Sequence, residues 1–178
     1  ALWLAAQRQQ RDYQHDVVQP LLQSLPACAE PVVYGHISYP AVTQSYPVYA
    51  VRSRDWQEQK PILLVTGGVH GYETSGIQGA LLFIKEHFSR YSAVANVVVL
   101  PCISPWAYET INRWNPKALD PNRSFRAGSG CEESLALMDY LESKPCNIQL
   151  HIDLHETTDT DNSEFRPALA ARDGIVQD

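Results

Sequence analysis

The sequence predicts an α/β fold in which a mixed, largely parallel β-sheet is sandwiched between helices. Two observations support this prediction. Continuous apolar segments at residues 62–65 and 97–100 are typical of strands buried on both faces. Apolar residues at helical spacing follow each segment, and strands that alternate with helices form layered α/β domains.

The segment before Pro61 is expected to form a helix followed by two strands. Apolar residues at helical spacing predict helix within residues 2–25, and Pro20 should kink it or start a new helix. Residues 32–38 and 48–52 are β-branched and aromatic, which favours strands. This segment contains no motif that indicates a particular chemistry.

The central segment is expected to place a helix between two buried strands. Apolar residues recur at helical spacing over residues 73–88, between the strands at 62–65 and 97–100. Residues 104–130 are rich in Pro, Asn, Gly and Arg, which predicts loops with little regular structure. Loops of this length inside a compact domain are often functional.

The C-terminal segment is expected to add one helix and one strand. Residues 129–132 match a capping box, in which Ser129 would start the helix. The apolar residues Leu135, Met138 and Leu141 should then face inward. Alternating apolar and polar residues over 148–155 predict a strand with one apolar and one polar face.

The composition is that of a globular protein and excludes several classes of function. With 178 residues, 44% hydrophobic and 19% charged, the chain is expected to form a single domain over residues 1–178. Its formal net charge of -6 argues against nucleic-acid and anionic-membrane partners, since both attract positive surfaces. No apolar segment reaches the roughly 18 residues of a membrane span.

The first residues and the spacing of the cysteines predict the location and the redox state. The first ten residues do not follow the basic, apolar, small order of a signal peptide, so the cytoplasm is the default location. The 4 cysteines are scattered without a C-x-x-C pair, and we expect free thiols.

The first candidate site is the segment 67–73, which contains an H-x-x-E motif between a buried strand and a helix. Glycines there permit tight turns with positive φ, which would let His70 and Glu73 converge on one point. By itself, the motif is equally compatible with a solvated histidine and a glutamate attracted to the N-terminus of a helix.

The second candidate site lies at the end of the C-terminal strand. Alternation places His151, Asp153 and His155 on one face, and His155 alone reaches the strand end, where clefts form in open sheets. We expect His151 to be a core histidine. Zinc-bound imidazoles commonly donate their second N–H to a carboxylate, and Asp153 is a candidate for that role. Two histidines, one carboxylate and an open position form a catalytic zinc arrangement.

The third candidate site is the loop region that contains Arg113, Arg123 and Arg126. The planar guanidinium group suits bidentate binding of a carboxylate, and an arginine near a metal stabilises an oxyanion. Taken alone, these residues are more typical of surface arginines without a specific contact.

Together the three segments resemble the zinc carboxypeptidase superfamily, including its succinylglutamate desuccinylase and aspartoacylase branch. Residues 67–73 are similar to the H-x-x-E ligand pair of that family. Residues 120–125 are similar to its D-x-N-R-x-F substrate-carboxylate motif, and residues 153–155 to its D-x-H third ligand. The order and approximate spacing agree, and the resemblance spans about residues 61–172.

The resemblance implies a role for each matching residue. His70, Glu73 and His155 would hold one zinc ion. Asn122 and Arg123 would bind a free substrate carboxylate. Upstream of that motif, Arg113 would be the catalytic residue that polarises the carbonyl and stabilises the oxyanion.

The sequence departs from the family at two points. Pro121 stands where the family usually has an apolar residue such as leucine. The general-base glutamate of the family lies on a later strand, whereas Glu156 and Glu164 lie too close to His155 to match it. We therefore expect a general base outside this chain and a catalytic domain that is truncated after Asp178.

The implied function is that of a metallocarboxypeptidase-like hydrolase, which cleaves an amide bond next to the free carboxylate of a peptide. A deacylase of N-acyl amino acids is the alternative, favoured by the short separation of Glu73 from His155 and by the Thr157–Thr158 pair. A metal-binding module without catalytic activity is the third possibility.

Overall fold

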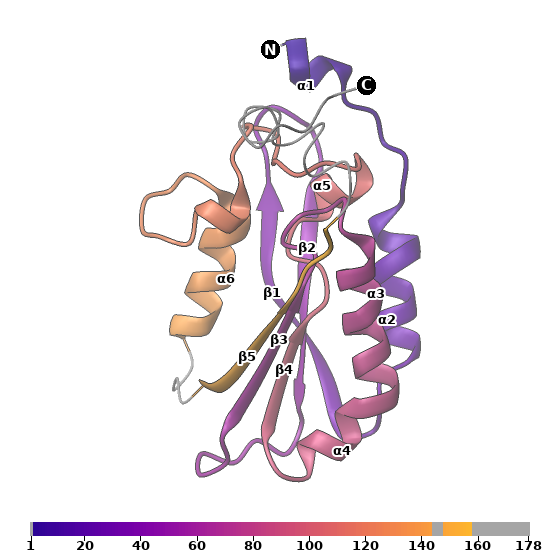
Figure 1. Ribbon diagram of the computed structural model, residues 1–178, viewed down its shortest axis with the longest axis vertical. Coiled ribbons are helices and arrows are strands. Elements are labelled where there is room, and N and C mark those ends of the chain that lie inside the picture. The colour runs from indigo at the N-terminus through magenta and orange to yellow at the C-terminus, as the bar shows by residue number, and fades with distance from the viewer. Residues whose placement is uncertain (1, 144–147, 158–178) are drawn as a thin grey trace.

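The computed structural model describes residues 2–143 and 148–157, which form a five-stranded sheet with helices on both faces (Figure 1). The strands are β1 (Ala29–Ser38), β2 (Ser45–Ser53), β3 (Ile62–Gly67), β4 (Asn96–Leu100) and β5 (Ile148–Leu154). The α-helices are α1 (Leu2–Ala6), α2 (Gln19–Gln23), α3 (Thr74–Leu82), α4 (Phe88–Ser92), α5 (Pro105–Glu109) and α6 (Glu132–Glu142). Shorter helical turns are η1 (Gln14–Val18), η2 (Phe83–His87) and η3 (Pro121–Arg123).

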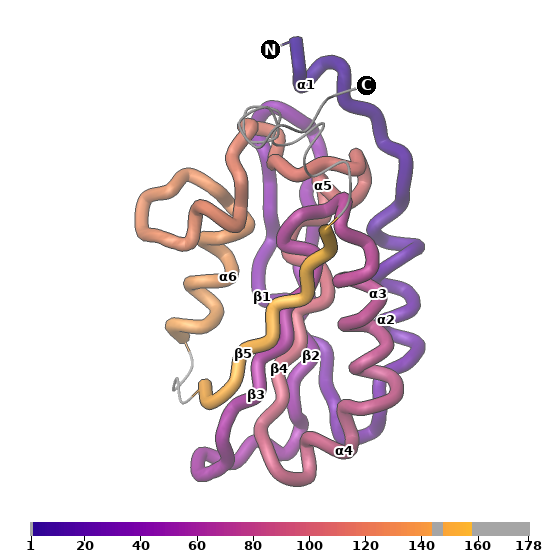
Figure 2. The backbone as a smooth tube through the Cα atoms, viewed as in Figure 1, coloured from indigo at the N-terminus to yellow at the C-terminus, as the bar shows by residue number. Residues whose placement is uncertain are grey.

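The sheet is mixed, with the strand order β1-β2-β4-β3-β5. Strand β2 is antiparallel to both of its neighbours, β1 and β4. Strand β3 is parallel to β4 on one side and to β5 on the other. All strands except β2 therefore run in one direction, and the predicted fold class is confirmed. The backbone trace in Figure 2 shows β5 lying beside β3.

The two faces of the sheet carry separate hydrophobic clusters. On one face, Val65 and Val99 pack with Ile77 of α3 and with the N-terminal helical segments. On the other face, the cluster is completed by Leu137 and Tyr140 of α6. The central strands β3 and β4 are buried along their whole length because helices cover both sides. Strand β5 is exposed over most of its length.

The predicted N-terminal helix is present only in pieces. The segment between Ala6 and Tyr13 is not helical, and η1 and α2 form the part that packs on the sheet through Val17 and Leu21. Pro20 is the second residue of α2, at the point where the π-helical turn η1 passes directly into α2. The loop prediction for residues 104–130 also omitted α5 and η3.

The capping box predicted at Ser129 is wrong. Helix α6 begins at Glu132 with Cys131 as its N-cap and without a side-chain cap, while the Ser129 hydroxyl accepts the N–H of Cys131 at 3.4 Å. The buried face of α6 is therefore rotated from the predicted one. It contains Glu133, Ser134, Leu137 and Tyr140, whereas the predicted Leu135, Met138 and Leu141 are half-buried.

The described cysteines Cys28, Cys102 and Cys131 are free thiols, and Cys146 lies outside the described residues. Every helix in the described part of the chain is too short or too polar to cross a lipid bilayer.

Candidate metal centre

His70 and His155 follow neighbouring parallel strands at the same edge of the sheet. Strand β3 ends at Gly67 and β5 ends at Leu154, and these two residues are paired in the sheet. Because the strands run in parallel, the segments that leave them emerge side by side. The two imidazole rings that follow have their centroids 5.4 Å apart.

The turn that carries His70 and Glu73 needs glycine at two positions. Gly68 has a φ of 62°, which residues with a side chain rarely adopt. Gly71 lies so close to α5 that a Cβ atom there would be 1.9 Å from the backbone nitrogen of Tyr108. This close packing allows the chain to turn back, and the Glu73 N–H bonds to the His70 carbonyl at 3.2 Å.

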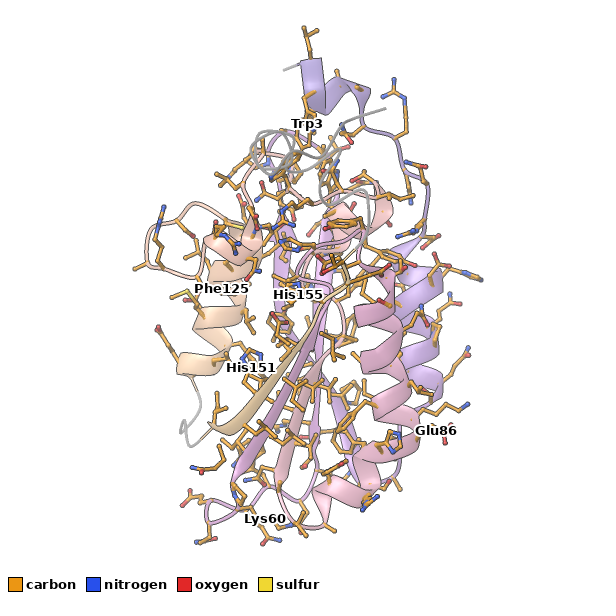
Figure 3. The ribbon with its side chains drawn as sticks, viewed as in Figure 1. Trp3, Lys60, Glu86, Phe125, His151 and His155 are labelled. Carbon is orange, nitrogen blue, oxygen red and sulfur yellow. The ribbon has the colours of Figure 1, made fainter. Side chains whose placement is uncertain are left out.

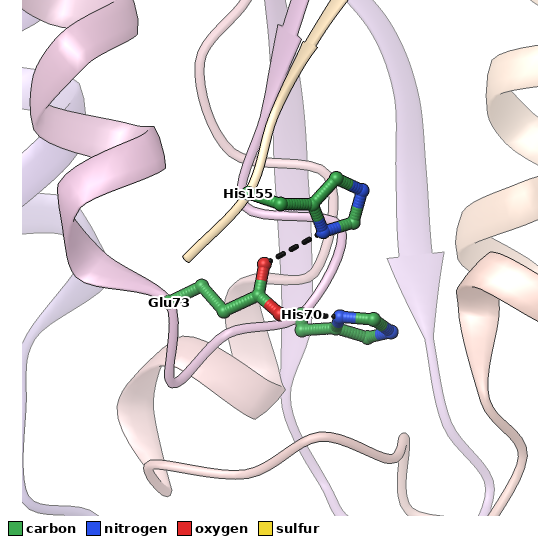
Figure 4. A group of neighbouring side chains, drawn as sticks. All are labelled: His70, Glu73 and His155. Atoms are coloured by element: carbon green, nitrogen blue, oxygen red, sulfur yellow. Dashed lines mark hydrogen bonds and ion pairs between the residues drawn. The ribbon is translucent and has the colours of Figure 1, made fainter. Parts of the chain in front are cut away.

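Three side chains converge at this edge of the sheet (Figure 4). The Glu73 carboxylate lies between the rings, with Oε1 2.7 Å from Nδ1 of His70 and Oε2 2.8 Å from Nδ1 of His155. One potential ligand atom from each residue lies within 4.8 Å of the others. The side chains of His70 and Glu73 are 2% and 3% exposed, whereas that of His155 is 32% exposed, so the cluster opens to solvent at His155.

Each imidazole is bonded to an aspartate through its second nitrogen. Nε2 of His70 lies 3.0 Å from Oδ1 of Asp120, and Nε2 of His155 lies 2.7 Å from Oδ2 of Asp153. Nδ1 of each ring faces Glu73, so both nitrogens of each imidazole point at a carboxylate oxygen, which only accepts hydrogen bonds when ionised. A cation bound at the cluster would take the place of the hydrogen at Nδ1 and leave the hydrogen on Nε2 bonded to the aspartate.

The sequence predicted one of these two aspartates as a partner of a candidate ligand. Asp153 was expected beside His155, and it lies there. Asp120 was not assigned a role of its own, although it opens the D-x-N-R-x-F motif. Its position at the start of a motif that was expected near the metal is the sequence feature that could have indicated this role.

The surrounding charges keep both buried carboxylates ionised. Burial raises the pKa of Asp120, but the hydrogen bond to His70 and the positive charge of Arg113 outweigh it and lower the pKa to about 2. Burial likewise raises the pKa of Glu73, and its bonds to His70 and His155 leave it lowered overall. Burial lowers the pKa of His70, whereas Asp120 and Glu73 raise it, and the net shift is upward.

Arg113 is joined to the cluster through Asp120. Its guanidinium is 4% exposed and donates from Nε to Oδ2 of Asp120 at 3.0 Å and from Nη1 to the Tyr72 hydroxyl at 3.4 Å. Asp120 therefore binds an arginine and an imidazole with its two oxygens. Arg113, the arginine predicted from the sequence, is thus connected to His70 through Asp120.

Asn122 and Arg123 lie in η3, directly after Asp120. The Asp120 side chain caps this turn by accepting the N–H of Asn122 at 2.9 Å. Asn122 is half-buried, whereas Arg123 is exposed and its Nη1 donates to the Asn122 carbonyl at 3.3 Å. Because Asp120 bonds both to this turn and to His70, the turn lies next to the cluster.

Two other polar residues of the last described segment have partners elsewhere. His151 is hydrogen-bonded, through Nε2 to the hydroxyl of Thr66 at 2.8 Å, but it is exposed on β5 and is not the core histidine that the sequence predicted. The Glu156 carboxylate accepts the N–H and the hydroxyl of Ser75 in the first turn of α3, at 3.0 and 2.7 Å. Glu156 is therefore engaged with a helix N-terminus. Glu164 and Thr158 lie outside the described residues.

The chemistry of the converging atoms suits a divalent cation. Two imidazole nitrogens and one carboxylate oxygen, with one side open to solvent, form the ligand set of many catalytic zinc sites. Lone pairs and a negative charge this close together repel unless a cation or protons lie among them. The aspartate behind each ring matches the usual support of metal-bound histidines.

Comparison with known proteins identifies a family and a shared fold. The sequence profile of the succinylglutamate desuccinylase/aspartoacylase catalytic domain matches residues 59–172. Among curated protein sequences, none matches the chain.

Several solved structures are similar to this chain. A provisionally assigned metallopeptidase from Shewanella denitrificans is 21% identical with a TM-score of 0.63, over 79% of this chain and 50% of its own. A provisionally assigned metallopeptidase from Shewanella baltica is 23% identical with a TM-score of 0.57, over 71% and 47%. A metallo-carboxypeptidase from Burkholderia cenocepacia is 15% identical with a TM-score of 0.61, over 79% and 39%. The described chain thus spans half or less of the length of these proteins, and at these identities they share its fold.

Proposed function

This chain belongs to the succinylglutamate desuccinylase/aspartoacylase catalytic domain family, and from that premise we propose a metal-dependent hydrolase that cleaves an amide bond next to a free carboxylate. In this proposal His70, Glu73 and His155 bind one zinc ion. The observation that carries it is the convergence of their ligand atoms within 4.8 Å, with an aspartate bonded to the far nitrogen of each ring.

The residues around the cluster would divide the work of such a reaction. When bound, a zinc ion polarises the scissile carbonyl and lowers the pKa of a water toward about 7. Asp120 and Asp153 hold the two rings with Nδ1 directed at the cluster, where the ion would be bound. Asn122 and Arg123 bind the substrate carboxylate, for which the guanidinium fork is suited. Arg113, held by Asp120, contributes positive charge where the oxyanion forms.

We favour an N-acyl amino acid as the substrate. The matching family is named for a desuccinylase of succinylglutamate and for aspartoacylase, and both names describe the removal of an acyl group from an acidic amino acid. A carboxypeptidase is the second candidate, because the turn of Asn122 and Arg123 would accept the terminal carboxylate of a peptide equally well. Both reactions use the same ligands and the same carboxylate-binding turn.

The metal site is tested by measuring zinc stoichiometry and affinity. The purified protein should bind one equivalent of Zn²⁺, and His70→Ala, Glu73→Ala and His155→Ala should each reduce this far below one. His36→Ala serves as the control, because His36 lies on β1, away from the sheet edge that carries the cluster. Wild-type protein that binds no Zn²⁺, or full binding by all three variants, would overturn the assignment.

The substrate class is tested with a panel of N-acyl amino acids and peptides that end in a free carboxylate. Release of the amino acid from N-succinyl or N-acetyl acidic amino acids, with intact peptides, supports the deacylase. Hydrolysis restricted to the peptides supports the carboxypeptidase. Zinc bound at one equivalent without turnover of any member, in the longest natural form of the protein, supports the non-catalytic module.

A further inference from the structure

The hydrogen bonds of the cluster continue past His155 into the sheet. Asp153 bonds to His155 with Oδ2, and its other oxygen, Oδ1, accepts from the Thr66 hydroxyl at 2.6 Å. Thr66 is bonded in turn to Nε2 of His151 at 2.8 Å. In Figure 3 the two labelled histidines lie along β5, with His155 at the end that reaches the cluster.

The hydroxyl of Thr66 has one hydrogen, and its two partners determine where it points. The ionised Asp153 carboxylate only accepts, so the Thr66 hydrogen is directed at Oδ1. The oxygen of Thr66 is then the acceptor for the hydrogen on Nε2 of His151. Every bond in the series runs toward Asp153, which receives hydrogens from both Thr66 and His155.

The burial of these residues shows which of them can act as an anchor. Thr66 is 1% exposed and lies on β3, between β4 and β5. The Asp153 side chain is 31% exposed and lies on β5, which is covered along one edge only in the described part of the chain. A buried hydroxyl on a central strand is thus the rigid partner of an aspartate on a more exposed strand.

The Thr66 end of these bonds is shielded from water. Thr66 is 1% exposed, and Thr66, His151 and Asp153 line one side of a cavity of about 230 Å³, whose other walls include Leu137 and Met138 of α6. A hydrogen bond is stronger where water is excluded, and leaving a buried hydroxyl unpaired is costly. The Thr66 hydroxyl therefore keeps its bond to Asp153, and this bond restrains the orientation of the carboxylate.

We propose that Thr66, oriented by His151, is a positioning residue for the metal site: it fixes the Asp153 carboxylate, which fixes the tautomer and ring orientation of His155. The inference rests on the proposed function, because it assigns Thr66 a task only if His155 is a ligand. The neutral alternative is that Thr66 and His151 satisfy each other in the sheet and leave the metal unaffected.

The test uses the substitution Thr66→Val, which keeps the shape and removes the hydroxyl. Replacing a partner of a metal-ligating histidine typically costs about 10–100-fold in metal affinity. Thr66 contacts Asp153 and does not contact His155 itself, so we expect a smaller loss of zinc affinity, about 3–10-fold. Competition with a chromophoric chelator measures the Zn²⁺ affinity, and the visible spectrum of the Co²⁺-loaded protein reports the ligand geometry.

Two readouts separate positioning from a structural role. Thr66→Ser restores the hydroxyl and should restore the affinity and the Co²⁺ spectrum. In the zinc-loaded protein, ¹⁵N NMR of His155 should show a strongly hydrogen-bonded Nε2–H in the wild type and a more weakly bonded one in Thr66→Val. Ser53→Ala is the control, because Ser53 is also a buried, hydrogen-bonded hydroxyl but lies at the far end of the sheet. It should lower stability without changing the affinity.

A double substitution makes the inference specific. In the background of Asp153→Asn, the further change Thr66→Val should cost little, because the residue through which it acts is already altered. If Thr66→Val does not fold, His151→Leu on the exposed strand replaces it and should weaken zinc binding in the same direction.

Three outcomes would count against the proposal. Zinc affinity and Co²⁺ spectrum that match the wild type in Thr66→Val or His151→Leu would overturn the positioning role and leave the proposed ligands standing. Additive losses in the double variant would show that Thr66 does not act through Asp153. Wild-type protein that binds no metal would instead overturn the proposed function, and this inference with it.

Discussion

Oδ1 of Asp120 lies 3.0 Å from Nε2 of His70, the ring nitrogen that does not face Glu73. Replacing it with asparagine keeps the size of the side chain but removes the charge that holds the His70 ring and the guanidinium of Arg113. We expect Asp120→Asn to lower zinc affinity by about 10–100-fold, as for other partners of metal-bound histidines. Chelator competition measures this. Asp55→Asn, at an exposed residue, is the control, and equal affinities in the two variants would contradict the assignment.

Arg123 is expected to affect substrate binding and not metal binding. It is exposed in the turn after Asp120, so its removal leaves the contacts of the cluster intact. A hydrogen bond to a charged group contributes about 1.5–3 kcal/mol, which corresponds to a rise in KM of about 10–100-fold in Arg123→Ala. Steady-state kinetics and zinc titration are compared with those of Arg126→Ala, another exposed arginine of the same loop. A similar loss of zinc and substrate affinity would indicate a structural role.

Gly71 should tolerate no side chain. A Cβ atom there would lie 1.9 Å from the Tyr108 backbone nitrogen, which a rotamer change cannot relieve. We expect Gly71→Ala to destabilise the protein by about 3 kcal/mol or more. Gly35→Ala is the matched control, because Gly35, like Gly71, does not have a positive φ, and the nearest atoms to its added Cβ atom lie at 3.5 Å, an ordinary contact. Urea unfolding of the two variants should differ by more than the error, and equal stabilities would contradict the packing argument.

Ala118→Gly is expected to stabilise the fold. Ala118 is exposed and has a φ of 58°, in the left-handed region that costs a residue with a Cβ atom about 1–2 kcal/mol. Part of that gain is lost to the larger chain entropy of glycine, which leaves about 0.5–1 kcal/mol. Ala93→Gly, at an exposed residue with a φ of -63°, should instead destabilise. The same sign for both changes in urea unfolding would refute the prediction.

The described cysteines should differ in their reactivity. Burial and the nearby Glu133 carboxylate raise the pKa of the Cys131 thiol to about 12, so little thiolate forms at neutral pH. Cys102 is 1% exposed and its pKa is also raised by burial, whereas Cys28 is partly exposed. Alkylation of the native protein, followed by peptide mapping, should modify Cys28 first. Modification of Cys131 at the same rate as Cys28 would contradict the structure.

The convergence of His70 and His155 could be predicted from the sequence because it depends on a local rule. His70 and His155 each follow a strand, and parallel strands deliver their ends to one edge of the sheet. The roles of Asp120 and Thr66 depend on contacts between residues 50 and 87 positions apart, with His70 and Asp153 respectively. No local pattern encodes such contacts.

Other differences arise because periodicity gives the spacing of a helix but not its rotation. Helix α6 buries Glu133, whose carboxylate binds Tyr39 and Asn115, and this polar anchor rotates the helix away from the face that hydrophobicity predicts. The loop before Arg113 contains a second irregularity, since Ile111 has a φ of 52°. Branched side chains rarely adopt that conformation, so no sequence pattern would predict it.

The contact between Glu73 and His155 joins positions 82 residues apart, and β4, α5 and α6 lie in the segment between them. Coordination of one ion by both residues would therefore close a long loop of the chain in the manner of a reversible cross-link. Strand β5, exposed over most of its length, would then separate from β3 only after a ligand was lost. An ion at 100 times its Kd stabilises the folded state by about 2.7 kcal/mol. Metal binding would thus also set the rate at which a protease cleaves strand β5.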